Sequence, residues 1–163
     1  MSALVLPLTR CFQLGYVTRS FDSGVAAARE RFGIDDFKFM RDLSGHSRHI
    51  ALAYVGGIMV EVVEPQDPVN GIYAAALPVE EGAMALHHLG YLIDTDSGWD
   101  AMRRAVLHYA GGVAAEGEFG ETLRFLYADT RALLGHFVEY IQLGVQGREM
   151  FASVPGNRKA VTL

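Results

Sequence analysis

The sequence predicts an α+β fold in which two βαβββ modules form an open, eight-stranded, cup-shaped sheet with the helices on its outside. The first observation is an internal repeat: Gln13-Leu14-Gly15-Tyr16-Val17 corresponds to His88-Leu89-Gly90-Tyr91-Leu92, which lies 75 residues later (88 − 13). The second is that each copy is followed by Asp-Ser-Gly, at residues 22–24 and 96–98. The third is that each copy closes on an apolar, strand-like run that contains one carboxylate. These carboxylates are Glu61 and Glu139, which are 78 residues apart (139 − 61). A repeat of this period indicates two copies of one supersecondary unit.

The composition is that of a folded protein, and we expect one domain over residues 1–163. Half of the residues are hydrophobic and 20% are charged, which excludes a disordered chain. The formal net charge is −5 and no long basic run occurs, so nucleic acid is not an expected partner. No run approaches the roughly 20 apolar residues that a membrane helix needs. The single Cys11 allows no internal disulfide, so we expect a protein of the reducing cytoplasm.

The first module is expected at residues 11–65. It begins with a strand at residues 11–18, and Asp22 or Ser23 then caps a helix that ends at Gly33. The inner face of this helix has helical spacing and comprises Val25, Ala28 and Phe32. The three strands that follow are expected at residues 37–42, 49–55 and 58–64. Gly56-Gly57 is a tight turn between the last two, and Pro65 ends the module.

The second module, at residues 86–143, repeats this plan after a connector at residues 66–85. A strand at residues 86–93 leads to Ser97-Gly98-Trp99-Asp100, which has the pattern of a capping box. The inner face of the second helix comprises Trp99, Met102, Val106 and Tyr109, and Gly111-Gly112 ends the helix. The last three strands are expected at residues 113–117, 121–128 and 134–143. Residues 144–163 are expected to form a C-terminal loop.

Strand alternation predicts that four polar side chains share one face of the sheet. Side chains point to opposite faces at successive positions of a strand. The helices need apolar partners, so the face that packs under them comprises Leu14, Tyr16, Val60, Val62, Leu89, Tyr91, Val138 and Tyr140. The other face, inside the cup, then receives Gln13, Glu61, His88 and Glu139.

These four side chains form a suitable ligand set for a divalent metal ion. A buried, isolated carboxylate costs several kcal/mol or takes up a proton, and two carboxylates that face one site also repel each other. A divalent cation removes both problems, because its charge balances the two glutamates Glu61 and Glu139. His88 and Gln13 complete four protein ligands, which leaves room for water or substrate.

The whole pattern resembles the vicinal oxygen chelate superfamily, which includes glyoxalase I, methylmalonyl-CoA epimerase, extradiol dioxygenases, and the fosfomycin and bleomycin resistance proteins. The resemblance covers about residues 11–143 and rests on the paired strand starts, the Asp-Ser-Gly helix entries and the glutamate strands described above. The ligand pattern of zinc-type glyoxalase I is similar to Gln, Glu, His and Glu. It is matched in order by Gln13, Glu61, His88 and Glu139. The epimerase pattern, His, Gln, His and Glu, is matched only at His88 and Glu139.

The resemblance implies a glyoxalase-type lyase or isomerase that transfers a proton through an enediolate or enolate. The substrate would be a small carbonyl compound, a thiol adduct or a thioester. The general base would be Glu139, with Glu61 as the second candidate. The metal would be zinc or nickel, with cobalt and manganese as alternatives. We expect a homodimer, and the sequence leaves open whether each site lies within one chain or is shared by two.

Five further residues are candidates for substrate contacts, each with core packing or solvation as the alternative. His49 and Arg124 would offer polar contacts, and apolar walls would come from Phe39, Met150 and Phe151. Two other functions remain open for the same fold. One is a metal-free protein that sequesters a ligand, as resistance proteins do, and the other is a dioxygenase of the same superfamily.

Overall fold

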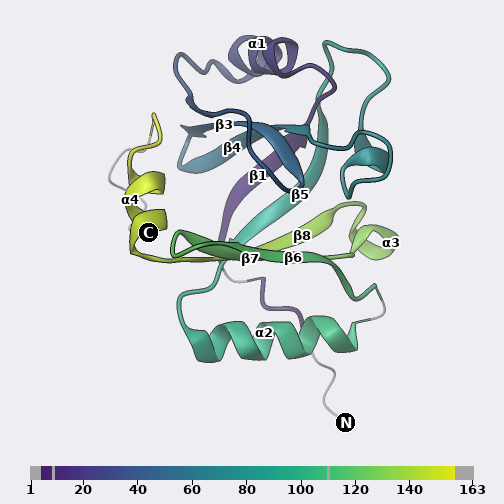
Figure 1. Cartoon of the computed structure of the whole chain (residues 1–163), viewed down its shortest axis with the longest axis vertical. Helices are drawn as coiled ribbons and strands as arrows, with labels where there is room; N and C mark the ends of the chain where they lie inside the picture. The colour runs from purple at the N-terminus through teal and green to yellow at the C-terminus, as the bar shows by residue number, and fades with distance from the viewer. Residues whose placement is uncertain (1–4, 9, 110, 157–163) are drawn as a thin grey trace. The chain divides into compact units, whose positions relative to one another are not determined.

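The structure, a computed structural model, describes residues 5–8, 10–109 and 111–156 (Figure 1). The elements of the first half are β1 (Cys11–Val17), α1 (Phe21–Phe32), β2 (Lys38–Met40), β3 (Ser47–Val55), β4 (Ile58–Pro65) and the 3-10 helix η1 (Ala74–Ala76). Those of the second half are β5 (Ala85–Leu92), α2 (Asp96–His108), β6 (Val113–Phe119), β7 (Leu123–Ala128), α3 (Arg131–Leu134), β8 (Phe137–Leu143) and α4 (Val145–Ala152). The strands form an eight-stranded sheet in the order β2-β3-β4-β1-β5-β8-β7-β6. The predicted α+β fold with two βαβββ repeats is confirmed. Within the described part of the chain, no helix is long and apolar enough to cross a membrane.

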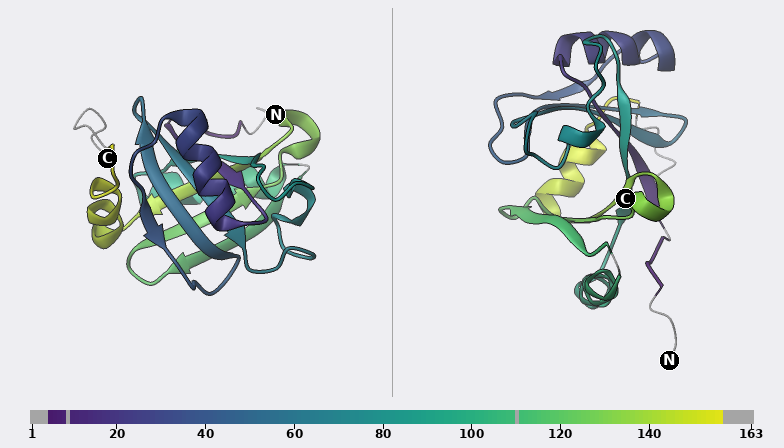
Figure 2. Two further views of the ribbon diagram at one scale, coloured as in Figure 1. Left: turned by 90° about the horizontal axis from the view of Figure 1, so that it is seen from above. Right: turned by 90° about the vertical axis from the view of Figure 1, so that its right-hand side faces the viewer.

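The chain divides into two compact units, and the boundaries between them fall inside β1, inside β5 and before the last residue of α4. Among the described residues, the first unit comprises 13–87 and 152–156, and the second comprises 5–12 and 88–151. In the first unit β1 is parallel to β4, and β4 and β2 are antiparallel to β3. In the second unit β5 is parallel to β8, and β8 and β6 are antiparallel to β7. Figure 2 shows these strands, and the helix of each unit, in two further views.

The helix of each unit covers the sheet face that the alternation predicts. In the first unit Tyr16, Val60 and Val62 pack with Val25 and Ala28 of α1. In the second unit the corresponding cluster consists of Leu89, Tyr91, Val138 and Tyr140 together with Trp99, Met102 and Val106 of α2. In both units, the positions that pack on the helix alternate with positions whose side chains leave the sheet on the other face.

The glycine of the repeated Asp-Ser-Gly motif is required by a close approach of the helix to the preceding strand. A Cβ atom at Gly24 would lie 2.7–2.8 Å from three side-chain atoms of Thr18. A Cβ atom at Gly98 would lie 3.0 Å from Thr95 Oγ1 and 3.3 Å from Ile93 Cγ2. The motif repeats because both helices begin close to the end of the strand before them.

The helix caps differ from the prediction. The N-cap of α1 is Ser20, before the predicted Asp22 or Ser23, and its side chain makes no capping bond. Instead, the backbone N–H of Phe21 donates to Glu64 Oε2 at 2.8 Å, so a carboxylate from β4 satisfies a free amide of the helix. The N-cap of α2 is Thr95, whose Oγ1 accepts from Gly98 N at 3.1 Å, and not the predicted Ser97.

Two other segments differ from the sequence-based expectation. Residues 144–163 were expected to form a loop, but α4 occupies Val145–Ala152, and residues 157–163 lie outside the described part. The last strand begins at Phe137 and not at residue 134, because α3 ends at Gly135 with a left-handed φ of 79°. In the connector, Tyr73 and Leu77 pack against Val17 and Val63 and so belong to the core of the first unit.

Candidate functional site

In the first unit, Gln13 and Glu61 lie on the sheet face opposite α1. Gln13 of β1 is in register with Met59 of β4, and Gly15 is in register with Glu61. Tyr16 and Val62, at the alternate positions, pack with α1, so Gln13 and Glu61 must leave the sheet on the other side. Both side chains are buried, with 1% of Gln13 and 8% of Glu61 exposed. The predicted placement of these two residues is confirmed within this unit.

The amide of Gln13 is oriented by a neighbour on β4. Its Nε2 donates to the thioether sulfur of Met59 at 3.8 Å. Its Oε1 is buried and makes no hydrogen bond within the described residues. A buried carbonyl oxygen in this state is an acceptor available to a ligand. A metal ion that binds Gln13 would also bind this oxygen, which accepts no hydrogen bond from the described residues.

In the second unit, His88 and Glu139 form a buried pair on the face opposite α2. His88 Nε2 lies 3.2 Å from Glu139 Oε2, and the exposed fractions are 0% for His88 and 6% for Glu139. The ring of Tyr127 meets the imidazole edge-on, with the centroids 5.2 Å apart and an interplanar angle of 87°. Tyr127 is in register with Glu139 across β7 and β8, so it packs beside both members of the pair.

The two units present their polar residues in the same register. Glu61 is opposite Gly15 and Glu139 is opposite Gly90, each across a pair of parallel strands. In both units the carboxylate therefore has a neighbour without a side chain, and the amide or imidazole lies two residues before that glycine. The sequence repeat is thus also a repeat in the sheet register.

The donor chemistry of these side chains fits a divalent cation. An amide oxygen, an imidazole nitrogen and two carboxylates are all common ligands of zinc and related metals. Within the described ranges, no three His, Cys, Asp or Glu side chains are grouped closely enough to hold a metal ion. What each unit supplies is a pair, Gln13 with Glu61 and His88 with Glu139. Coordination of one cation by all four stays a prediction.

Three of the five predicted substrate contacts lie on the helix-covered faces. Phe39 is in register with Ala51, which packs with α1, and the His49 ring lies 5.2 Å from that of Phe21. Arg124 donates to Asp96 at 2.7 Å and lies 4.6 Å from the centroid of Trp99, so it packs on α2. These three side chains leave the sheets opposite the polar residues, and we do not include them in the candidate site.

The other two predicted substrate contacts, Met150 and Phe151, lie in α4 and not in a loop. Phe151 is buried, and its ring centroid lies 5.8 Å from that of Phe12 in the same unit. Met150 is half-buried. Phe151 thus has the core-packing role that was its alternative, and substrate contact by either residue stays a prediction.

The sequence-based reasoning missed Tyr54 of β3, which lies on the same face as Gln13. Tyr54 is in register with Met59, which is in turn in register with Gln13. Only 6% of Tyr54 is exposed, and its hydroxyl makes no hydrogen bond with any described residue. The predicted Gly56-Gly57 turn was sufficient to find it, because a two-residue turn between β3 and β4 pairs Tyr54 with Met59.

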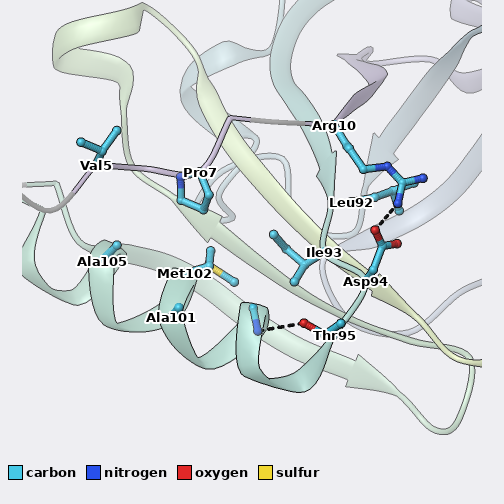
Figure 3. Close-up of a pocket in the computed structure, with 11 residues that line it drawn as sticks. Val5, Pro7, Arg10, Leu92, Ile93, Asp94, Thr95, Ala101, Met102 and Ala105 are labelled. Carbon is cyan, nitrogen blue, oxygen red and sulfur yellow. Dashed lines mark hydrogen bonds and ion pairs between the residues drawn. The ribbon is translucent and has the colours of Figure 1, made fainter.

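A separate pocket of about 510 Å³ lies in the second unit. Figure 3 shows Val5 and Pro7 on one wall and Ala101, Met102 and Ala105 of α2 on the other, with the Arg10–Asp94 ion pair at one end. None of the predicted ligands lines this pocket, so we do not assign the candidate site to it.

No protein-family model matches the chain, and no curated protein matches it. Among solved structures, the chain is similar to methylmalonyl-CoA epimerase from Mycobacterium tuberculosis, with a TM-score of 0.58 and 15% identity over 94% of this chain and 96% of that chain. It is also similar to methylmalonyl-CoA epimerase from Streptomyces coelicolor in complex with 2-nitronate-propionyl-CoA, with a TM-score of 0.55 and 16% identity over 83% of this chain and 98% of that chain. A hypothetical protein from Bacillus halodurans gives a TM-score of 0.58 and 14% identity over 82% and 93% of the two chains.

At these identities the similarity shows the fold. Methylmalonyl-CoA epimerases are members of the vicinal oxygen chelate superfamily, so the fold that the resemblance implied is confirmed. The glyoxalase-type assignment of the ligands Gln13, Glu61, His88 and Glu139 is not tested by the similarity and stays a prediction.

Proposed function

We propose that the protein is an isomerase-type enzyme that removes and returns a proton at the carbon next to the carbonyl of a thioester or related carbonyl substrate. The observation that carries the proposal is the buried His88–Glu139 pair, with Nε2 and Oε2 3.2 Å apart, on a sheet face whose register repeats that of Gln13 and Glu61. The similarity to methylmalonyl-CoA epimerases, one of them described in complex with methylmalonyl-CoA, supports a thioester as the substrate class.

Glu139 is the proposed general base. Its carboxylate takes the proton from the carbon. The electron pair of the C–H bond forms a C=C bond to the carbonyl carbon, and the π pair of the C=O bond moves onto the oxygen to give an enolate. To complete an epimerisation, a second acid on the opposite face of the carbon must donate a proton to the enolate, and Glu61 is the candidate for this acid. Contact with His88 and burial on the sheet face opposite α2 restrict the orientation of the carboxylate. Glu61, at the equivalent position of the first unit, is the second candidate for the proton transfer.

We propose further that Gln13, Glu61, His88 and Glu139 bind one divalent cation. Such a cation would stabilise the negative charge that develops on the substrate oxygen. The proposal of one shared cation rests on the internal repeat and on the burial of all four side chains. Zinc and nickel are the first metals to test, followed by cobalt and manganese.

The test is proton exchange at the carbon next to the carbonyl of methylmalonyl-CoA in deuterated water, followed by mass spectrometry. Glu139→Gln should slow exchange by roughly 10²- to 10⁴-fold, as expected for loss of a general base. Glu118→Gln is the matched control, because Glu118 is an exposed glutamate of the same unit. Exchange at the parental rate in Glu139→Gln, with the fold intact by circular dichroism, would refute the assignment of the base.

Elemental analysis of the purified protein, together with the exchange assay, distinguishes the metal-dependent isomerase from the alternative functions. We expect one cation per chain and loss of exchange on chelation. Two cations per chain would indicate that each unit binds its own. A metal-free protein that binds ligands tightly without proton exchange would favour the sequestering function, and oxygen uptake that requires Fe(II) would favour a dioxygenase.

A further inference from the structure

Tyr54 is a buried titratable residue that the proposed mechanism does not yet use. Its hydroxyl has no hydrogen-bond partner within the described part of the chain. Tyr54, Met59 and Gln13 are in register across β3, β4 and β1, so they form one row on the face of the first unit that α1 does not cover. The next row of the same face comprises Leu52, Glu61 and Gly15.

Two polar groups of this row, one able to donate a hydrogen bond and the other only able to accept one, lack partners among the described residues. The hydroxyl of Tyr54 can donate a hydrogen bond, whereas Oε1 of Gln13 can only accept one. A buried polar group without a partner costs about 1–3 kcal/mol, and native proteins contain few of them. Two in one row, beside the carboxylate of Glu61, indicate that a bound molecule supplies the missing partners.

The strand β1 places a glycine in the row next to these groups. Gly15 contributes no side chain to the row of Glu61, so the position between Gln13 and Glu61 is not filled from β1. Burial raises the pKa of the Tyr54 hydroxyl to about 12. At neutral pH this group therefore keeps its proton and acts as a donor, not as a base.

We propose that the Tyr54 hydroxyl donates a hydrogen bond to an oxygen of the substrate, a carbonyl or carboxylate oxygen that lies over the Gln13–Met59–Tyr54 row. This inference rests on the proposed function, because it assigns a substrate contact to the face that carries Gln13 and Glu61. It makes Tyr54 a specificity residue: substrates with an acceptor oxygen at this position are favoured over analogues that carry a methyl group there.

The test compares Tyr54→Phe with Tyr140→Phe. Tyr140 is the matched control, because its hydroxyl is also buried and without a hydrogen-bond partner among the described residues but lies in the core under α2. Tyr54→Phe should lower kcat/KM for methylmalonyl-CoA by roughly tenfold to a hundredfold, as for the loss of a hydrogen bond to a charged or strongly polar oxygen. Tm and metal content should stay at the parental values or rise slightly. Tyr140→Phe should leave kcat/KM unchanged.

Several outcomes would overturn this inference. If the parent is active and Tyr54→Phe is equally active, the hydroxyl does not contact the substrate, and the proposed function stands. If Tyr54→Phe instead lowers Tm by several degrees with kcat/KM unchanged, the hydroxyl is held by buried water and its role is structural.

If the parent shows no proton exchange, the proposed function fails and calorimetric binding of methylmalonyl-CoA decides the role of Tyr54. A tenfold or greater loss of affinity in Tyr54→Phe supports the contact. Equal affinity in the parent and the variant, or no binding to the parent, overturns it.

Discussion

The repeated glycines Gly24 and Gly98 occupy equivalent sequence positions, but the structure predicts different costs when each is replaced by alanine. At Gly24 the new Cβ would lie 2.7–2.8 Å from three atoms of Thr18. Thr18 is fully buried, and its Oγ1 donates to the carbonyl oxygen of Ser20 at 3.1 Å, so its side chain cannot move aside without losing that bond. At Gly98 the nearest atom is Thr95 Oγ1 at 3.0 Å, which also accepts from Gly98 N at 3.1 Å. A shift of a few tenths of an ångström relieves the contact and keeps this bond within hydrogen-bonding distance.

These distances set the expected magnitudes. Overpacking of a filled site costs about 1–3 kcal/mol, and the higher helix propensity of alanine returns at most about 1 kcal/mol. Gly24→Ala should therefore destabilise the protein by roughly 1–2 kcal/mol, whereas Gly98→Ala should be neutral within about 0.5 kcal/mol. For a chain of this length, 1 kcal/mol corresponds to about 2–4 °C in Tm.

Thermal unfolding followed by circular dichroism measures both effects. Gly82→Ala is the control, because a Cβ at Gly82 meets nothing within 4 Å. We expect Gly24→Ala to melt roughly 2–8 °C below the parent, with Gly98→Ala and Gly82→Ala within about 2 °C of it. Equal Tm values for the two repeat variants would refute the explanation of the motif by close approach to Thr18.

Two further predictions concern a helix cap and a pH dependence. Thr95→Ala should cost about 1 kcal/mol in chemical denaturation, because it removes the hydrogen bond from Gly98 N, whereas Ser20→Ala, whose side chain makes no capping bond, should cost clearly less; equal losses would contradict this account. The pKa of Tyr54 is about 12 in the folded protein and about 10 in the unfolded chain, so the folded state keeps this proton to a higher pH. The contribution of Tyr54 to the free energy of unfolding is therefore complete below pH 10 and is lost as the pH rises towards 12. Over this range the parent should therefore lose up to about 3 kcal/mol more stability than Tyr54→Phe, measured by urea unfolding at each pH. Parallel pH profiles would contradict the raised pKa of Tyr54.

Strand alternation placed the polar residues correctly within each unit. The apolar positions around Gln13 and Glu61 face α1, and those around His88 and Glu139 face α2. This was predictable because a strand alternates its side chains whatever its partners are. The internal repeat then predicted that these polar residues form a site, because they recur at equivalent positions in both copies.

The placements that failed depend on which segments meet. Arg124 was a candidate for contact with the substrate, but its guanidinium donates to Asp96 and lies over the ring of Trp99. Glu64 was expected only as the end of a strand, and it satisfies the first amide of α1. In both cases the partner lies on another element, and no local pattern in the sequence identifies it.

The sequence by itself determined the duplication, the strand and helix order, and the face on which each polar residue lies, because these follow from periodicities between neighbouring residues. Only the tertiary structure decided that His88 and Glu139 are in contact, and that Tyr54 stands in one row with Gln13. Contacts of this kind join residues tens of positions apart. Their distances depend on strand pairing and packing, which are set by the whole fold and not by any one segment.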